Sequence, residues 1–438
     1  MKNFSGHVED LRRNWKRARS TGFIHLLTSN VATRVLAFLM IIAVARFLSP
    51  ADVGRVNIML AVFAVLVAIA NFGTTTSILK LCSEDISEAD LLGFFFQGTL
   101  LNVVTSLLTY SIAVLIVLSR IVTNDPALIG LLPWFLLALL SSTMNNYFFA
   151  YFQSRQQIRF ISKLQASLKS GALIMVIIGL YFWRLRGFVF GYLLGDFISL
   201  GVYLLFVGRR TARVKVSLTR ERFRKVFHLS KYGAFANQLG QLLQYLDTMV
   251  MSMLRVDLAG IGFYSIAQYF ILGANQVTYT MSQVAVPRLS FHSGDIRKWG
   301  ESYSEYERIF RRITLGVSVG LLIFGPLVIL LFLKPAFRIS ILFLFILIVG
   351  FWARSYSAPK SIATWSLGRL DYNFFSSFAA SGLNLVLNIV LIISFGVFGA
   401  ASATSLAYIL SIPFFSHFLK KEVNRRRIAD LNWEEEGA

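Results

Sequence analysis

The sequence Arg46-Phe-Leu-Ser-Pro-Ala-Asp-Val-Gly54 separates two long apolar segments, residues 23–47 and 54–79. A helix needs about 20 apolar residues to cross the hydrocarbon core of a bilayer, so each segment is long enough for one span. Working outward from this junction, we find about 12 segments of this kind in the chain. They cover residues 23–47, 54–79, 91–119, 127–152, 160–183, 187–208, 229–253, 259–284, 310–333, 339–365, 373–395 and 397–419. The pattern predicts an all-α polytopic membrane protein.

The composition supports this prediction. Of the 438 residues, 56% are hydrophobic and 15% are charged, whereas a soluble chain is about 45–50% apolar and about 25% charged. The mean hydropathy of +0.63 agrees. One cysteine, Cys82, excludes an intramolecular disulfide, and the five histidines are scattered without the spacing of a metal site. We therefore expect neither a disulfide framework nor a histidine or cysteine metal centre.

The net charge of +21 could indicate a nucleic-acid-binding protein, but the placement of the basic residues favours a membrane topology. If both termini lie inside the cell, 30 lysine and arginine residues fall on the cytoplasmic side and 8 on the outer side. Cytoplasmic loops carry such an excess in membrane proteins. The sequence therefore predicts cytoplasmic termini in the inner membrane and no nucleic-acid partner.

The first junction has a counterpart 208 residues later, at Leu254-Arg-Val-Asp-Leu-Ala-Gly-Ile-Gly262. Both stretches place a glycine at the same offset from the preceding apolar segment. Parallel repeats of this kind are typical of transporters, with the substrate path between the halves. The predicted domains are a basic cytoplasmic tail (1–22), an N-lobe (23–208), a basic cytoplasmic linker (209–228), a C-lobe (229–420) and a C-terminal tail (421–438).

Charged residues inside the predicted spans are candidates for function, because a charge at mid-bilayer is costly and usually faces a cavity or a partner. Basic residues outnumber acidic ones five to two. The basic residues are Arg34, Lys169, Lys231, Arg354 and Lys360, and the acidic ones are Asp196 and Asp247. A cationic lumen suits an anionic cargo, above all phosphate groups. The alternative is that the three lysines extend to the membrane interface.

A polar stripe follows the seventh predicted span. Asn237, Gln241 and Gln244 are spaced i, i+4 and i+7, so they share one face of a helix. Amide groups on a lumen face would suit sugar hydroxyls. Hydrogen bonds between neighbouring helices are the alternative role.

Five stretches together carry a family resemblance: Arg34-Val-Leu-Ala-Phe38, Arg46–Gly54, Ala70-Asn-Phe-Gly-Thr-Thr-Thr76, Tyr245-Leu-Asp-Thr-Met249 and Gly260-Ile-Gly-Phe-Tyr-Ser-Ile-Ala267. They resemble the polysaccharide flippases of the multidrug/oligosaccharidyl-lipid/polysaccharide (MOP) superfamily. The resemblance implies a V-shaped, two-lobed fold with alternating access. It also implies a polyprenyl-diphosphate-linked oligosaccharide as cargo, for an O-antigen, capsule or exopolysaccharide. Membrane lipids, a polysaccharide polymerase and chain-length machinery are the other implied partners, and no covalent chemistry is expected.

The resemblance to the related lipid II flippase also implies a sodium site. That family holds the ion with an acid on helix seven, two polar residues on helix eleven, and a carbonyl and a hydroxyl on helix twelve. The matching positions here are Asp247, Asn384, Asn388, Ala400 (carbonyl) and Thr404. The second helix-eleven ligand is Asn rather than an acid, which weakens sodium binding. The alternatives are proton coupling at Asp247, an ion pair with a nearby lysine, and simple helix–helix hydrogen bonding.

Two other functions remain open at this point. A MATE-like, cation-coupled exporter of small molecules would share the fold, but such exporters favour cationic compounds and an acidic lumen. A membrane enzyme would need a catalytic group on a substantial loop, and the predicted outer loops have only about 5–10 residues. The cationic interior therefore favours a flippase.

Overall fold

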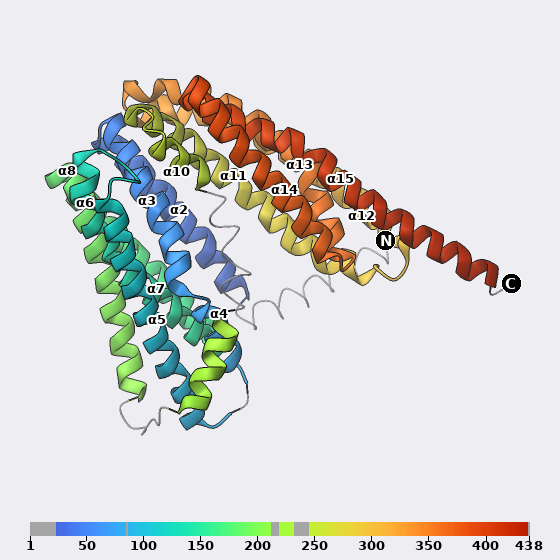
Figure 1. The fold of residues 1–438 in the computed structure, drawn as a ribbon, viewed down its shortest axis with the longest axis horizontal. Helices are drawn as coiled ribbons and strands as arrows, with labels where there is room; N and C mark the ends of the chain where they lie inside the picture. Colours follow the sequence, from blue (N-terminus) through green and yellow to red (C-terminus); the bar gives the residue numbers. More distant parts are fainter. Residues whose placement is uncertain (1–22, 85, 212–218, 232–244, 437–438) are drawn as a thin grey trace, which may run out of the picture. The chain divides into compact units, whose positions relative to one another are not determined.

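A computed structural model describes residues 23–84, 86–211, 219–231 and 245–436. Every regular element within these ranges is a helix (Figure 1). The first group comprises α2 (Phe23–Phe47), α3 (Pro50–Asn71), α4 (Thr74–Leu81), α5 (Glu88–Leu118), α6 (Pro126–Leu136), α7 (Ala138–Ser154) and α8 (Ile158–Thr211). The second comprises α10 (Leu246–Met253), α11 (Leu258–Phe291), α12 (Ile296–Phe332), η1 (Pro335–Ile339), α13 (Ser340–Ser366), α14 (Leu370–Phe395) and α15 (Val397–Glu436).

The helices confirm the all-α polytopic fold. By length and composition, eight helices of the described chain can cross a membrane: α3, α5, α6 continuing into α7, α8, α12, η1 continuing into α13, α14 and α15. Among these eight helices, α8 covers two of the predicted spans. Three further predicted spans contain α2, α10 and α11, which are not among the eight. Large apolar side chains project outward, with Leu115, Leu331 and Ile393 each at least 66% exposed. Such surfaces suit contact with lipid chains rather than with water.

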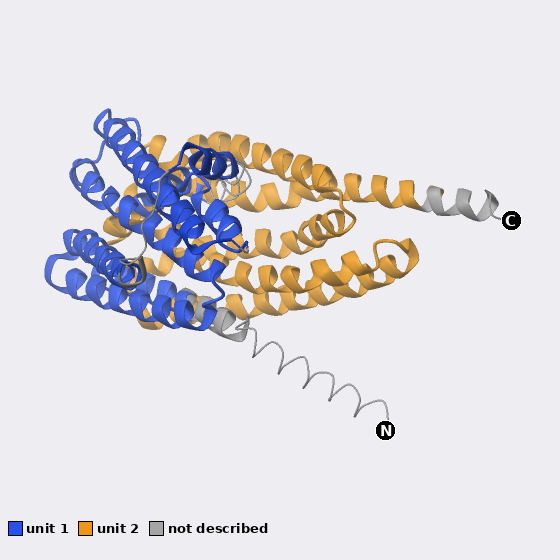
Figure 2. Cartoon of the chain, turned by 90° about the horizontal axis from the view of Figure 1, so that it is seen from below, with its two compact units in different colours: residues 1–48, 58–245 blue, residues 49–57, 246–438 orange. Residues whose placement is uncertain are grey.

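The chain forms two compact units, coloured separately in Figure 2. Unit 1 comprises residues 1–48 and 58–245, and unit 2 comprises residues 49–57 and 246–438. In unit 1, α2 and α7 pack on α8, and α4 and α5 pack on α7. In unit 2, α13 lies against α11, α12 and α15, while α14 lies against α15. The start of α3 thus belongs to a different unit from the rest of that helix.

Helix α8 folds back on itself where the sequence predicts two separate spans. The reversal occurs at Arg184, whose φ of 53° and ψ of −127° are not helical. This conformation is costly for a residue with a side chain, and the Arg184 guanidinium is held by a 2.7 Å hydrogen bond to the carbonyl of Phe47. Between α14 and α15, 212 residues later, Gly396 adopts nearly the same angles (φ 56°, ψ −131°). The matching turns show that the repeat extends beyond the first junction.

Glycines allow the two arms of α8 to lie very close together. A Cβ atom on Gly179 would overlap the carbonyl of Gly187, and one on Gly187 would overlap the carbonyl of Gly179. Further along the hairpin, a Cβ on Gly191 would lie 2.7 Å from the carbonyl oxygen of Met175. Small residues at such contacts are the usual means of close helix packing in membranes.

The two copies of the repeated junction meet each other in unit 2. A Cβ atom on Gly54 would overlap the carbonyl of Leu258, and a Cβ on Gly262 would overlap the carbonyl of Pro50. Because Pro50 and Leu258 are themselves 208 residues apart, the contact is reciprocal. The first turns of α3 and α11 therefore pack backbone to backbone, which only glycine permits at these two positions.

We expect Gly262→Ala to destabilise the protein by about 1–3 kcal/mol, because the added methyl group must separate two backbones that are already in contact. Gly273→Ala in the same helix is the control, since a Cβ at Gly273 meets nothing within 4 Å. Alanine there should be neutral or stabilising by about 0.5–1 kcal/mol. Thermal unfolding of the detergent-solubilised variants measures both effects, and equal midpoints would contradict the close contact.

An aromatic core in unit 1 encloses the single cysteine. The ring of Phe95 lies 4.4 Å from that of Tyr151 and 5.8 Å from that of Phe148. Cys82 is fully buried in this cluster, and its sulfur lies 3.9 Å from the carbonyl oxygen of Leu91. Burial raises the pKa of the Cys82 thiol to about 12. The thiol is therefore both inaccessible and protonated.

Cys82 should resist maleimide labelling in the native protein at pH 8. With a pKa near 12, the thiolate fraction at that pH is about 10⁻⁴. Denaturation removes the burial that raises the pKa, so labelling should then reach one equivalent. Mass spectrometry before and after denaturation measures the difference, and full labelling of the native protein would contradict the buried position.

Candidate functional site

A buried carboxylate in unit 2 accepts hydrogen bonds from three other helices. Asp247 lies on α10 and is 6% exposed. Its Oδ2 accepts from the hydroxyl of Tyr264 on α11 at 2.6 Å and from the hydroxyl of Thr404 on α15 at 2.7 Å. Its Oδ1 accepts from the amide Nδ2 of Asn388 on α14 at 2.8 Å. Hydrogen bonds to a charged acceptor are among the strongest polar interactions inside a protein.

The Asn388 amide also contacts the preceding turn of α14. Its Nδ2 lies 3.0 Å from the carbonyl oxygen of Asn384 and 3.1 Å from Asn384 Oδ1. The Asn388 side chain is fully buried, and its Oδ1 has no hydrogen-bond partner. Ala400 is also fully buried, one turn before Thr404 on α15. The structure thus brings Asp247 into one group with Asn384, Asn388 and Thr404, and places Ala400 on the adjoining turn.

This group fits a monovalent cation by its chemistry. It offers oxygen ligands, which hard cations prefer, and one carboxylate to balance one positive charge. The unpartnered Oδ1 of Asn388 is a further oxygen available to an ion. Among the described residues, no three histidine, cysteine or acidic side chains gather as a metal cluster would require. The donors of this group are oxygens, without the histidine or cysteine ligands that transition metals favour.

A second polar chain joins the start of α3 to the same region of unit 2. Asn57 donates from Nδ2 to the hydroxyl of Thr248, 3.1 Å away, beside Asp247. The hydroxyl of Tyr269 on α11 donates to Asn57 Oδ1, also at 3.1 Å. These contacts attach Ser49–Asn57 to α10 and α11.

Arg354, predicted to bind an anionic cargo, lies partly buried on α13. Its guanidinium donates to Asn275 Oδ1 on α11. The same group lies over the ring of Tyr408 on α15, 5.8 Å from the ring centroid. Asn275 and Tyr408 therefore hold a cation between three helices of unit 2.

Lys360, also on α13, belongs to a different group. It lies one turn after Tyr356, whose ring carries the guanidinium of Arg311 at 4.5 Å from its centroid. Arg311 forms a 2.6 Å ion pair with Glu307 one turn earlier on α12, and both are electrostatic neighbours of Lys360. Because six residues separate Arg354 from Lys360, the two cations point to different sides of α13. The structure does not bring them together.

Lys169 in unit 1 faces an acid rather than standing alone. Its Nζ lies 3.7 Å from Oδ1 of Asp196, with the lysine half-exposed and the aspartate buried. Ser141 and Asn145 of α7 hydrogen-bond Asp196 Oδ2 and its backbone carbonyl. The lysine pairing considered for Asp247 is thus found at the other intramembrane aspartate.

The remaining predicted cargo-binding residues are described only in part by the structure. Lys231 is partly buried and is the last described residue of the helical stretch that covers residues 220–231. Arg34 lies on α2, and its side chain is outside the described part of the structure. Asn237, Gln241 and Gln244 lie outside the described residues.

Sequence reasoning missed several polar contacts of unit 2. Tyr264 is fully buried against Asp247, a contact that no charge or spacing in the sequence indicates. Glu307 and Arg311 both lie on α12, which begins at Ile296, well before the predicted span at 310–333. Asn275 and Tyr408 are neutral, so the search for charged residues in the spans does not identify them as partners of Arg354. The polar spacing of Glu307 and Arg311, at i and i+4, was the one signal in the sequence for their pairing.

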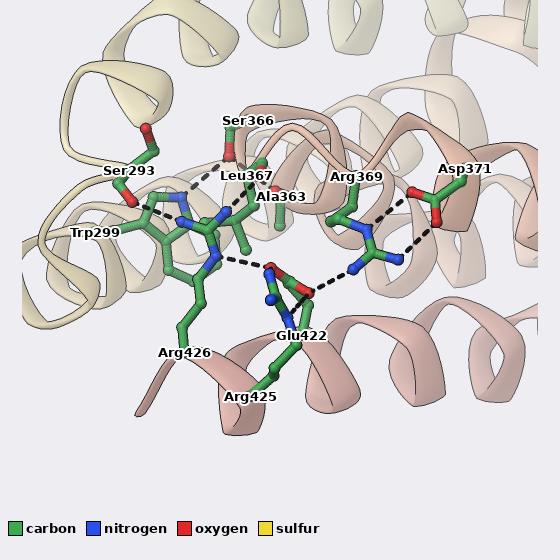
Figure 3. Close-up of polar contacts among 10 residues, drawn as sticks. All are labelled: Ser293, Trp299, Ala363, Ser366, Leu367, Arg369, Asp371, Glu422, Arg425 and Arg426. Atoms are coloured by element: carbon green, nitrogen blue, oxygen red, sulfur yellow. Dashed lines mark hydrogen bonds and ion pairs between the residues drawn. The ribbon is translucent and has the colours of Figure 1, made fainter. Parts of the chain in front are cut away.

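Three arginines converge on one buried acid toward the C-terminal end of α15 (Figure 3). Glu422 is fully buried and accepts from Arg369 at 3.1 Å, from Arg425 at 2.7 Å and from Arg426 at 2.8 Å. Arg369 also forms a bidentate pair with Asp371. The predicted boundary between the C-lobe and a tail, at residues 420 and 421, falls inside this helix.

Arg426 connects the same cluster to two turns of unit 2. It donates to the carbonyl of Ser293, between α11 and α12, at 2.8 Å. It also donates to the carbonyl of Leu367, between α13 and α14, at 2.7 Å. The Glu422 cluster, meaning Glu422 with Arg369, Arg425 and Arg426, therefore clamps one end of the helix bundle.

Comparisons with known proteins agree with this architecture. The sequence model of the family described as "Polysaccharide biosynthesis protein" matches residues 20–292. An uncharacterised membrane protein in the cps region of Klebsiella pneumoniae is 24% identical over 305 residues, 67% of this chain and 60% of that protein. The match thus spans less than two thirds of the Klebsiella protein. An uncharacterised membrane protein of Methanocaldococcus jannaschii is 22% identical, over 91% of this chain and 83% of its own.

Solved structures share the fold. An inward-facing multidrug resistance MATE family transporter of the MOP superfamily aligns with a TM-score of 0.75 and 12% identity, covering 90% of this chain and 95% of its own. The lipid II flippase MurJ, in an inward closed conformation, aligns with a TM-score of 0.72 and 17% identity, covering 91% and 87%. At these identities the likeness concerns the fold.

Proposed function

The chain belongs to the polysaccharide biosynthesis protein family, and from that membership we propose that it is a flippase for a polyprenyl-diphosphate-linked oligosaccharide. The cargo would be the repeat unit of an O-antigen, a capsule or an exopolysaccharide. The observation that carries the proposal is Arg354, a cation held by Asn275 and Tyr408 inside a bundle of membrane helices. Arginine is well suited to bind phosphate oxygens, and within the described chain the partly buried Arg354 contacts an amide and an aromatic ring rather than an acid.

In this proposal the basic side chains bind the charged head group, and the polyprenyl tail stays in the lipid. Arg354 provides the guanidinium, and Arg311 with Lys360 provides a second basic group on α12 and α13. The proposal also assigns Arg34, Lys169 and Lys231 to the head group, and Asn237, Gln241 and Gln244 to sugar hydroxyls. No bond is made or broken, so the protein acts as a transporter rather than an enzyme.

Asp247 is the proposed coupling group. A sodium ion would be held by Asp247, Asn384, Asn388, Thr404 and the carbonyl of Ala400, and its charge would neutralise the buried carboxylate. A proton on Asp247 would achieve the same neutralisation. In either case the net charge of the site changes during the cycle, while Tyr264 and Thr404 hold the carboxylate in place with their hydroxyl groups.

The proposed setting is the cytoplasmic membrane, with both termini in the cytoplasm. The strongly basic stretch 209–225 would then lie on the cytoplasmic side, as the positive-inside rule requires. A polysaccharide polymerase and chain-length machinery would use the exported unit.

Mass spectrometry of lipid-linked intermediates tests the function directly. A strain lacking this gene is compared with the same strain carrying it on a plasmid. Accumulation of one polyprenyl-diphosphate oligosaccharide only in the deletion strain supports the proposal and identifies the cargo. Intact surface glycans without accumulation would contradict it, and would favour the MATE-like exporter, which shares this fold.

A further inference from the structure

The NH₂ group of Asn388 stands at the centre of a cluster of oxygens. Three acceptors surround it: Asp247 Oδ1 at 2.8 Å, the Asn384 carbonyl at 3.0 Å and Asn384 Oδ1 at 3.1 Å. An amide NH₂ has two hydrogens, so two donors are shared among three acceptors. The three oxygens, one of which belongs to a carboxylate, therefore have a greater capacity to accept a positive charge than one neutral NH₂ group satisfies.

The other end of the same amide is in the opposite situation. Asn388 Oδ1 is buried and has no donor, although buried polar atoms are almost always hydrogen-bonded. Rotation of the amide by about 180° would exchange the positions of Oδ1 and Nδ2. Oδ1 would then face the three other oxygens, which is favourable only if a positive group lies between them. A cation is such a group, because it would bind Asn388 Oδ1 together with the three oxygens that now face Nδ2.

We propose that the Asn388 amide substitutes for the coupling cation when the site holds none, and that cation binding requires this amide to turn over. This inference rests on the ion coupling in the proposed function, and it assigns a specific role to Asn388. The NH₂ group satisfies Asp247 Oδ1 in the cation-free state, while Tyr264 and Thr404 satisfy Oδ2 in both states. The amide thus competes with the cation for the same oxygens.

The residue type at position 388 follows from this competition. An aspartate there would add a second carboxylate next to Asp247 and would remove the donor. Two buried carboxylates repel each other, so such a site would depend on a bound cation. Asparagine instead keeps the cation-free state folded and makes release of the cation easier.

Two variants separate the donor from the charge. Asn388→Asp removes the NH₂ and adds a negative charge, whereas Asn388→Ser removes the NH₂, keeps an oxygen and adds no charge. The matched control is Asn102→Asp in α5, because Asn102 is equally buried and its Oδ1 is also without a partner. Its Nδ2 donates to the hydroxyl of Thr74 at 2.7 Å rather than to a carboxylate.

The measurement is the thermal unfolding midpoint of the full-length, detergent-solubilised protein across a NaCl series, with choline chloride holding the ionic strength constant. We expect the half-saturating sodium concentration to fall at least tenfold in Asn388→Asp and several-fold in Asn388→Ser, relative to wild type. Asn102→Asp should lower the midpoint without changing the sodium dependence. An Asn388→Asp protein that folds only in sodium, and not in choline, also supports the proposal.

Three results would overturn the proposal. One is an unchanged sodium dependence in both Asn388 variants, and another is the absence of any sodium effect in all proteins. The third is a half-saturating sodium concentration that falls in Asn388→Asp but rises in Asn388→Ser. The added negative charge alone would then explain the tighter sodium binding of Asn388→Asp. None of these results bears on flipping, since the accumulation of lipid-linked intermediates in the deletion strain is measured without reference to sodium.

Discussion

Arg354→Ala should reduce glycan export at least tenfold while the protein still folds. The guanidinium would donate charge-assisted hydrogen bonds to the diphosphate of the cargo. Each such bond contributes about 1.5–3 kcal/mol, which corresponds to roughly a factor of 10 to 100 in cargo binding. The deletion strain carrying this variant should accumulate the lipid-linked oligosaccharide to nearly the level of the strain without the gene. Arg34→Ala, in the other predicted lobe, should have the same effect.

Arg288→Ala is the matched control for this experiment. Arg288 pairs with Glu305 and is 63% exposed, so the variant removes one positive charge without touching the buried groups. Export should then stay at the wild-type level, and membrane abundance should be equal for all variants. Normal export by Arg354→Ala would contradict the proposed role of this cation.

Glu422→Ala should cause the largest loss of stability of any single substitution considered. The alanine leaves Arg369, Arg425 and Arg426 facing one another around a buried position without their common acceptor. Removal of one partner from a buried ion pair costs about 3–5 kcal/mol, and the partial exposure of the arginines places the expected loss near the lower value, about 3 kcal/mol. Thermal unfolding in detergent measures the loss.

The control substitution is Glu305→Ala, which breaks an ion pair of similar length. The Arg288–Glu305 pair is 2.9 Å long and both side chains are more than half exposed. Exposed pairs contribute about 0–1 kcal/mol, so this variant should unfold close to the wild-type midpoint. If Glu422→Ala were as stable as Glu305→Ala, the Glu422 cluster would not be a structural clamp.

The sequence predicted the spans well because hydropathy reports directly on contact with lipid. It also indicated the reversal in α8, since Arg184 and Arg186 interrupt the apolar residues there. Hydropathy fails where a helix continues beyond the bilayer. Hydropathy predicts a loop before position 310 and a tail after position 419, but α12 begins earlier and α15 continues further, through the charged residues there.

The polar group around Asp247 was only partly predictable. Asp247, Asn388 and Thr404 came from the family resemblance, and the structure brings them into contact. Tyr264 could not be identified, because an aromatic residue in a span has the same hydropathy whether it faces lipid or a buried acid. Packing between distant helices decides which of the two it does, and no local pattern reports that.

The sequence also could not predict which neighbours each basic side chain has in the folded protein. Arg354 and Lys360 are both charges on one predicted span, yet their neighbours come from different helices. Lys169 is a candidate by its charge alone, but Asp196 lies beside it only because the two arms of α8 fold together. Charge content is a property of the sequence, whereas charge pairing is a property of the tertiary structure.

The reciprocal contact of Gly54 with Gly262 limits how the chain can be divided. Residues 49–57 pack into unit 2 while the rest of α3 belongs to unit 1, so one continuous helix is shared by both. A fragment beginning at residue 229 would lack the segment that covers Gly262 and donates from Asn57 to Thr248. Residues 49–57 are therefore part of the fold of unit 2, and a protein divided between the two predicted lobes would lose them from that fold.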